Sequence, residues 1–220
     1  MIKAIIFDMD GVIVDTEFQD FRIQQEFIKK ENPSINQVKT NFDELIGQSY
    51  NMLYETLRKF IGSNDSLNEI KRRFEAYNAI AYESINYQQL FRKELLPILK
   101  WAKSKGVLLA VASSSTYEHI IEVLNSCNIK DYFDVIYSGE FVEESKPNPA
   151  IYLNTLEKLN VSANQAITIE DSCYGISAAK AAGITTIAYK ETRAAIDQSE
   201  ADYLVEDMTE AYEIIQTLNK

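Results

Sequence analysis

Two pairs of acidic residues have the spacing expected of a carboxylate-rich site. Asp8 and Asp10 are separated by one residue and directly follow a short apolar run, and Glu170 and Asp171 directly follow another. Carboxylates held this close repel one another, so a cation between them, or a shared proton, is the usual remedy. Together the two pairs would form an oxygen-ligand site suited to Mg²⁺, which normally keeps waters and shares its shell with a substrate phosphate.

A run of hydroxyl residues and one lysine supply complementary groups for an anion. Residues 113–116 are Ser-Ser-Ser-Thr and follow a third apolar run, and Lys146 stands at the start of an expected helix. A serine hydroxyl, the backbone N–H groups that open the next helix and the lysine ammonium could receive phosphate oxygens. The hydroxyl residues could equally be helix caps, and Lys146 a solvated cation. Together with the acids, these groups form a set whose chemistry suits a bound phosphate.

The elements that would carry these residues alternate between strands and helices. After the strand before Asp8, further strands are expected at 107–112, 135–137, 166–169, 184–189 and 203–205. Helices between them are expected to begin near Leu96, after the serines, at Ala150 and at Gly175, and Gly106 is expected to end the first of them. This alternation predicts a parallel sheet with helices on both faces. Because such a sheet gathers the carboxyl ends of its strands at one edge, the candidate residues should lie close together.

Residues 16–93 interrupt this alternation with helical patterns. The first helix is expected to begin at Thr16, which forms a capping box with Gln19, and further helices are expected at 50–61 and 67–84. We therefore expect a helical domain of residues 16–93, inserted into a core domain of residues 1–15 and 94–220. The expected fold class is α/β, with a Rossmann-like three-layer core.

Composition restricts the expected partners and location. The net charge of −11 would repel a nucleic-acid backbone or an anionic membrane, so neither is expected as a partner. Cys127 and Cys173, the two cysteines, lie far apart and outside any metal-binding pattern, which indicates reduced thiols. With no apolar stretch of membrane-spanning length and no leader pattern, a cytoplasmic location is expected. The expected oligomeric state is a monomer.

Four motifs, taken together, resemble those of the haloacid dehalogenase-like hydrolases, and within them the branch of phosphoglycolate phosphatase-like enzymes and β-phosphoglucomutase. The motifs are Asp8-Met9-Asp10-Gly11-Val12 with Asp15-Thr16-Glu17, Ala112-Ser113-Ser114-Ser115, Lys146-Pro147-Asn148-Pro149, and Glu170-Asp171-Ser172-Cys173-Tyr174-Gly175. They follow the family's order at family-like separations. The inserted helices resemble the family's small cap domain.

The resemblance implies hydrolysis of a phosphate monoester. Asp8 would be the nucleophile, forming an aspartyl-phosphate that water then hydrolyses. Asp10 would be the general acid for the leaving alcohol and later the base for the water. Ser113 and the N–H of Ser114 would donate to the phosphoryl group, and Lys146 would balance its charge and orient Asp8.

The resemblance also implies the metal and the role of the insert. Mg²⁺ would be bound by Asp8, the main-chain carbonyl of Asp10 and Asp171, with Glu170 as a further or indirect ligand. The metal would neutralise the charge that otherwise keeps a carboxylate from approaching a phosphate. The cap would close over the substrate and exclude bulk water.

The choice within the family depends on individual positions. Dehalogenating members lack an acid two residues after the nucleophile, so Asp10 favours phosphoryl transfer. The mutases have a His where this sequence has Asp20, and cations near the positions of Ile46 and Tyr50. We therefore predict a phosphatase whose partner is a small phosphorylated metabolite, of the sugar or polyol phosphate type. A β-phosphoglucomutase-like mutase and a non-catalytic phosphate- or Mg²⁺-binding regulator are the alternatives.

Overall fold

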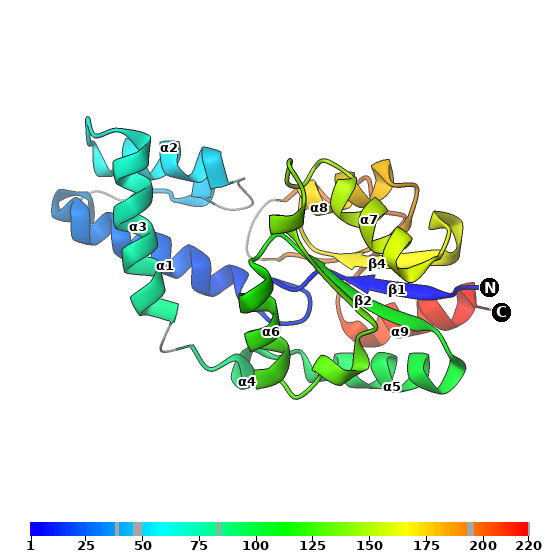
Figure 1. Cartoon of the computed structure of the whole chain (residues 1–220). Helices are drawn as coiled ribbons and strands as arrows, with labels where there is room; N and C mark the ends of the chain where they lie inside the picture. Colours follow the sequence, from blue (N-terminus) through cyan, green and yellow to red (C-terminus); the bar gives the residue numbers. More distant parts are fainter. Residues whose placement is uncertain (38–39, 46–49, 83–84, 193–195, 220) are drawn as a thin grey trace. The chain divides into compact units, whose positions relative to one another are not determined.

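The chain divides into two compact units. In this computed structural model, which describes residues 1–37, 40–45, 50–82, 85–192 and 196–219, one unit is formed by Met1–Asp15 and Tyr87–Lys220 (Figure 1). The other is formed by Thr16–Asn86. The chain therefore leaves the first unit after Asp15 and returns to it at Tyr87.

A parallel sheet forms the centre of the first unit. Its strands are β1 (Ala4–Phe7), β2 (Leu108–Ser113), β3 (Val135–Ser138), β4 (Ala166–Glu170), β5 (Thr185–Tyr189) and β6 (Tyr203–Val205). Their order across the sheet is β3-β2-β1-β4-β5-β6, and every neighbouring pair is parallel. The inner strands β1 and β4 are buried along their whole length, as expected for strands covered by helices on both faces. The predicted α/β fold with a parallel sheet is confirmed.

Helices cover both faces of this sheet. The helices of this unit are α4 (Tyr87–Leu90), α5 (Leu96–Lys105), α6 (Tyr117–Ser126), α7 (Ala150–Leu159), α8 (Cys173–Ala181) and α9 (Met208–Leu218). In Figure 1, α7 and α8 lie on one face, and α5 and α9 on the other. On the α7 face, Tyr152 and Leu156 pack in one buried cluster with Ile6 and Ala110 of the sheet. This packing fixes α7 against the strands that carry the candidate residues.

Short 3₁₀ turns complete the connections. They are η1 (Pro33–Gln37), η2 (Asp43–Leu45), η3 (Lys93–Leu95), η4 (Lys130–Tyr132), η5 (Gly139–Phe141) and η6 (Ala163–Gln165). Helix α5 ends as predicted at Gly106, whose φ of 69° is a left-handed conformation that glycine adopts without a Cβ penalty.

The second unit contains three longer helices, α1 (Glu17–Glu31), α2 (Tyr50–Ile61) and α3 (Leu67–Tyr82). Its core includes Phe27 and Phe74, whose ring centroids are 5.3 Å apart. The predicted capping box at Thr16 is wrong. Its backbone is already helical (φ −88°, ψ −24°) and its side chain makes no capping hydrogen bond, whereas a cap needs extended backbone. The predicted end of α3 at Ser84 lies outside the described residues.

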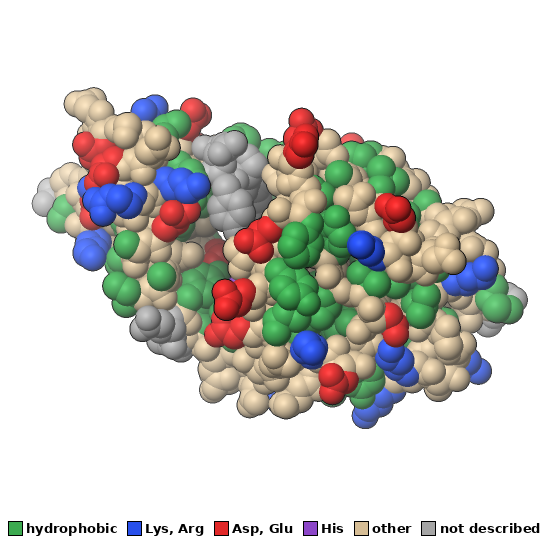
Figure 2. Space-filling model, in the orientation of Figure 1, with side chains coloured by type: hydrophobic (Ala, Val, Ile, Leu, Met, Phe, Trp, Pro, Cys, Tyr) green, Lys and Arg blue, Asp and Glu red, His purple; other side chains and the backbone are tan. Residues whose placement is uncertain are grey.

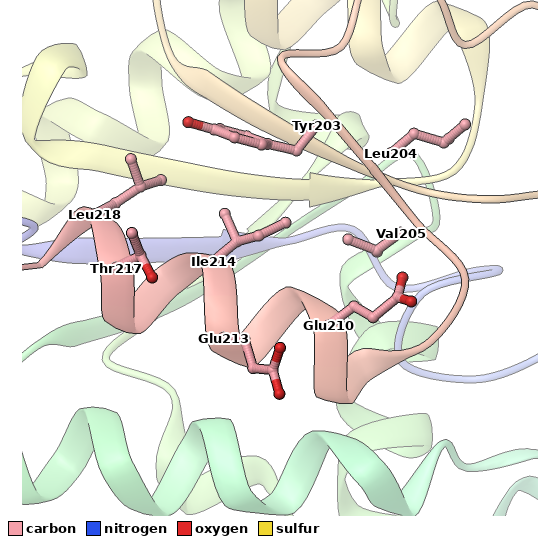
Figure 3. A pocket seen from close by; sticks show the side chains of 8 residues that line it. All are labelled: Tyr203, Leu204, Val205, Glu210, Glu213, Ile214, Thr217 and Leu218. Atoms are coloured by element: carbon pink, nitrogen blue, oxygen red, sulfur yellow. The ribbon is translucent and has the colours of Figure 1, made fainter.

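The described surface carries both signs of charge. Figure 2 shows acidic and basic side chains interspersed on the face in view. A surface pocket of about 360 Å³ lies between the edge strand β6 and α9 (Figure 3); its lining residues are Tyr203, Leu204, Val205, Glu210, Glu213, Ile214, Thr217 and Leu218. None of these residues belongs to the four motifs. Among the described helices, none combines the length and the apolar character that a membrane crossing requires.

Candidate active site

The candidate residues meet at the carboxyl edge of the sheet. Asp8 directly follows β1, Ser113 ends β2, and Glu170 ends β4 with Asp171 next in the chain. Lys146 comes from the connection between β3 and α7, and it brings its ammonium nitrogen to 2.6 Å from Asp8 Oδ1 and 2.6 Å from Glu170 Oε1. Asp8 and Glu170 are 138 and 24 positions from Lys146 in the chain, yet the three side chains form one buried ion cluster.

Three of the acids could hold a metal ion. Asp8, Glu170 and Asp171 each offer a carboxylate oxygen, and these oxygens all lie within 4.8 Å of one another. All three side chains are buried. Oxygen ligands in a cluster of this size suit a hard divalent cation.

All three N–H donors of the Lys146 ammonium group make hydrogen bonds. Besides Asp8 and Glu170, its Nζ donates to the carbonyl of Ala112 at 3.0 Å. An ammonium group has three N–H donors, so this set is complete. Burial alone would lower the pKa of Lys146, but the Asp8 and Glu170 carboxylates raise it well above its ordinary value. The lysine is therefore a permanent cation inside the site.

Burial dominates the ionisation of Asp8. The pKa of this carboxyl is raised from 3.8 to about 8, mainly by burial; Lys146 acts to lower it, and the charges of Glu170 and Asp10 act to raise it. The ionised form of Asp8 therefore needs more positive charge than one lysine provides. A divalent cation at the neighbouring carboxylates would supply it.

Glu170 has hydrogen bonds at both carboxylate oxygens. Its Oε1 accepts from Lys146 and, at 2.6 Å, from the hydroxyl of Tyr152. Its Oε2 accepts from the N–H of Asp171 at 3.1 Å and from the hydroxyl of Ser172 at 3.2 Å. Burial, and then the Glu170 charge, raise the pKa of Tyr152 well above its ordinary value, so the phenol stays a donor. These commitments favour an indirect role of Glu170 toward a metal.

Two glycines give the acids their space. At Gly11, with φ +80°, a Cβ atom would lie 1.8 Å from Asp171 Oδ2. At Gly175, a Cβ atom would lie 1.9 Å from Glu170 Oε1. Each carboxylate thus occupies the volume that a larger residue would fill, which explains why both motifs contain glycine at these positions.

The serine run holds Asp10 and orders its own loop. Ser115 Oγ donates to Asp10 Oδ2 at 2.8 Å, and the Ser115 N–H donates to Ser113 Oγ at 3.1 Å. A hydroxyl that accepts one bond can still donate its own proton, so Ser113 retains a donor. The cap of α6 is Thr116, whose side chain accepts from the N–H of His119. Ser114 follows β2, and its backbone lies against Gly139.

Three contacts of the site were not foreseen from the sequence. Ser115 was predicted only as part of the hydroxyl run, which could also cap a helix, and no role was predicted for Tyr152 of α7. Arg92, whose Nε donates to the carbonyl of Gly11 at 3.0 Å, belongs to none of the four motifs. Of these three residues, only Ser115, two positions after Ser113 in the same motif, could have been linked to the site from the sequence.

The positions that separate mutases from phosphatases fall in the second unit. Asp20 accepts a hydrogen bond from the hydroxyl of Tyr82. Ile46 and the side chain of Tyr50 lie outside the described residues. The structure therefore shows a local partner for Asp20 and adds nothing at the other two positions.

A family model described as haloacid dehalogenase-like hydrolase matches residues 5–189, which include all four motifs. The chain belongs to the haloacid dehalogenase-like hydrolase family. Among similar proteins of this hydrolase family, a phosphorylated carbohydrates phosphatase of Thermotoga maritima is 33% identical over 84% of this chain and 83% of its own length. A phosphoglycolate phosphatase of Aquifex aeolicus is 30% identical over 84% of this chain and 83% of its own length.

The fold of this hydrolase also matches solved structures. The β-phosphoglucomutase of Clostridium difficile superposes with a TM-score of 0.78, covers 99% of this chain and 97% of its own, and is 24% identical. At this identity the likeness shows the shared fold. Together with the phosphatase relatives, the family match confirms the predicted enzyme class, a phosphoric monoester hydrolase.

Proposed function

We propose that this hydrolase is a Mg²⁺-dependent phosphatase that cleaves a small sugar or polyol phosphate through an aspartyl-phosphate on Asp8. The observation that carries the proposal is the buried cluster in which Lys146 bridges Asp8 and Glu170, with Asp171 beside them. The substrate class is supported by the Thermotoga maritima relative, whose name specifies phosphorylated carbohydrates.

The donor set fits Mg²⁺. Asp8 and Asp171 would hold the ion together with the main-chain carbonyl of Asp10, and Glu170 would act mainly through its bonds to neighbouring groups. The carboxylate oxygens are hard ligands within 4.8 Å of one another. Bound there, the ion would reduce the repulsion between the carboxylate nucleophile and the phosphate.

The protein groups then have distinct parts in two displacements. In the first, a carboxylate oxygen of Asp8 bonds to phosphorus, the ester P–O bond breaks, and Asp10 gives its proton to the leaving alcohol. In the second, Asp10 takes a proton from water, whose oxygen bonds to phosphorus and releases Asp8. Ser115, which donates to Asp10, would hold that carboxyl group in place for both steps.

The remaining groups would bind the phosphate and orient the nucleophile. The Ser113 hydroxyl and the Ser114 N–H would donate to the phosphoryl oxygens. The three N–H donors of Lys146 already bond to Asp8, Glu170 and the carbonyl of Ala112. A direct bond to the phosphate would therefore replace one of these three hydrogen bonds. We therefore assign Lys146 first to charge balance and to the orientation of Asp8.

We further propose that the second unit is the cap domain of the family, and that the enzyme is a phosphatase rather than a mutase. In the mutases, a histidine stands at the position of Asp20. Here the Asp20 carboxylate accepts from Tyr82, which leaves an anion at that position and disfavours a second phosphate group.

The test is a panel of phosphomonoesters assayed with and without Mg²⁺. Phosphate release that requires Mg²⁺ and is abolished by Asp8→Asn supports the proposal. The matched control is Asp131→Asn, which changes an exposed aspartate of the same domain and should leave turnover intact. Interconversion of hexose phosphates with a bisphosphate activator would instead identify a mutase. No turnover across the panel would favour a non-catalytic regulator.

A further inference from the structure

Arg92 connects three segments at the carboxyl edge of the sheet. Its Nε donates to the carbonyl of Gly11 at 3.0 Å, its Nη1 donates to the hydroxyl of Tyr189 at 3.1 Å, and its Nη2 lies 3.2 Å from Asp15 Oδ1. The guanidinium carbon also lies 4.3 Å from the centre of the Tyr189 ring. With 17% of the side chain exposed, this planar group is held in one orientation.

The backbone around Arg92 is bonded to the same loop. The N–H of Arg92 donates to Ile13 O at 3.0 Å, and the N–H of Asp15 donates to Leu90 O at 2.9 Å. Between these bonds, Val14 forms an antiparallel bridge with Phe91. The position of the guanidinium relative to the loop after β1 is therefore fixed by backbone as well as by side-chain bonds.

Gly11 transmits this position to Asp171. The face of Gly11 that lacks a side chain lies against the Asp171 carboxylate, where a Cβ atom would be 1.8 Å from Oδ2. Arg92 holds the carbonyl of that same glycine. A shift of the Gly11 peptide would therefore change the wall against which the Asp171 side chain rests.

Gln198 holds Asp171 from its main chain. Its Nε2 donates to the carbonyl of Asp171 at 2.6 Å and to the carbonyl of Tyr189 at 2.7 Å. Its Oε1 accepts from the N–H of Glu191 at 3.2 Å. Tyr189, at the end of β5, is thus the common anchor of two supports, one through Arg92 and Gly11 and one through Gln198.

We propose that Arg92, Tyr189 and Gln198 form a bracket that positions Asp171 for metal binding. The proposal rests on the proposed function, in which Asp171 is a ligand of Mg²⁺. The bracket residues are positioning residues, because they act on the metal site through Gly11 and the Asp171 main chain. Supports behind metal ligands typically change metal affinity by about 10–100-fold when removed.

The experiment measures Mg²⁺ binding directly, by isothermal titration calorimetry on the full chain. Arg92→Met should weaken Mg²⁺ binding by at least about tenfold. Arg92→Lys should show a smaller loss, since lysine keeps the charge but not the planar fork. Gln198→Ala removes the second support and should also weaken binding. Lys190→Met is the matched control, because Lys190 neighbours Tyr189 but pairs with Glu206 instead.

Turnover separates this proposal from the proposed function. With a phosphomonoester substrate, raising Mg²⁺ to saturation should restore most of the turnover of Arg92→Met, which a general loss of folding would not allow. If the wild type binds Mg²⁺ but hydrolyses no ester, the proposed function fails while the bracket is still judged by the binding constants. A wild type that binds no Mg²⁺ overturns both.

The decisive comparison is between the bracket variants and the control. Mg²⁺ affinities of Arg92→Met and Gln198→Ala within about twofold of the Lys190→Met value would overturn the bracket. So small a change in affinity lies far below the loss expected when a support is removed. Should Arg92→Met fail to fold, Gln198→Ala decides the question by itself, since it alters a partly exposed side chain in a loop.

Discussion

Replacing Lys146 with methionine tests the ion cluster at its centre. Methionine keeps most of the length of the side chain and removes only the ammonium group. The change deletes three hydrogen bonds, at 2.6 Å to Asp8, 2.6 Å to Glu170 and 3.0 Å to the carbonyl of Ala112. It leaves two carboxyl groups that were balanced by one cation.

The burial of these groups sets the size of the effect. The Asp8 side chain is 10% exposed and the Glu170 side chain is 0% exposed, so water cannot replace the lost cation at low cost. Removing one partner of a buried ion pair costs about 3–5 kcal/mol. We expect one such cost rather than two, because Asp8, with a pKa raised to about 8, can bind a proton. For a protein of this size, the loss corresponds to a Tm lower by roughly 6–20 °C.

Thermal unfolding of the metal-free protein at neutral pH measures this loss. The matched control is Lys103→Met, which removes a lysine of the same unit that pairs with Asp134 at 2.9 Å but is 39% exposed. An exposed pair of this kind contributes about 0–1 kcal/mol. Adding Mg²⁺ should raise the Tm of Lys146→Met, since the bound ion can replace part of the positive charge that the lysine supplied.

A Tm for Lys146→Met that matches the control would refute this reasoning. It would mean that the two carboxylates do not depend on the lysine for their charge balance. The same variant should also lose most phosphate release, because Asp8 would lose the group that orients it.

Further predictions concern neighbouring groups. Gly11→Ala should weaken Mg²⁺ binding by about tenfold or more in calorimetry, since the new methyl group displaces the Asp171 carboxylate, a proposed metal ligand; wild-type affinity would contradict this. Tyr152→Phe should lower the free energy of unfolding by about 1.5–3 kcal/mol in urea, because the buried Glu170 loses a charge-assisted bond; an unchanged midpoint would be the opposing result. Burial acts to raise the pKa of Asp202, but its bonds, including that to Lys180, lower the pKa overall. Its ionised form therefore stabilises the fold above the ordinary value of 3.8 and ceases to do so as the pH falls through the lower folded value. Asp202→Asn should lower the Tm at neutral pH but not in strong acid, and an equal shift at both would refute this. EDTA should abolish phosphate release and Mg²⁺ should restore it; full activity in EDTA would exclude a metal requirement.

The main features of the fold could be predicted because they follow from local patterns. Short apolar runs separated by amphipathic stretches predicted the six parallel strands. Gly106 predicted the end of α5, because glycine readily adopts the left-handed backbone that the structure shows there. The capping box at Thr16 failed because the helical backbone at that residue depends on the surrounding chain rather than on the four-residue pattern. Local pattern thus predicted which elements exist better than how each begins.

The candidate site was predictable where its residues stand at strand ends. Asp8 and Glu170 could be placed at one edge because neighbouring parallel strands end there. Tyr152 and Arg92 could not, since their bonds join residues 18 and 81 positions apart, and no spacing rule connects such positions. Their roles depend on how α7 and β5 pack, which becomes visible only in three dimensions.

The most direct test of the central claim is to look for phosphate on Asp8. In Asp10→Asn, p-nitrophenyl phosphate should still transfer its phosphoryl group, because the leaving nitrophenolate needs little protonation, while hydrolysis of the aspartyl-phosphate should slow. With Mg²⁺ present, rapid acid quenching and peptide mass spectrometry should find one phosphoryl group on Asp8, matched by a stoichiometric burst of nitrophenolate. A folded, Mg²⁺-binding variant that shows no burst and no adduct, or an adduct on another residue, would contradict the account.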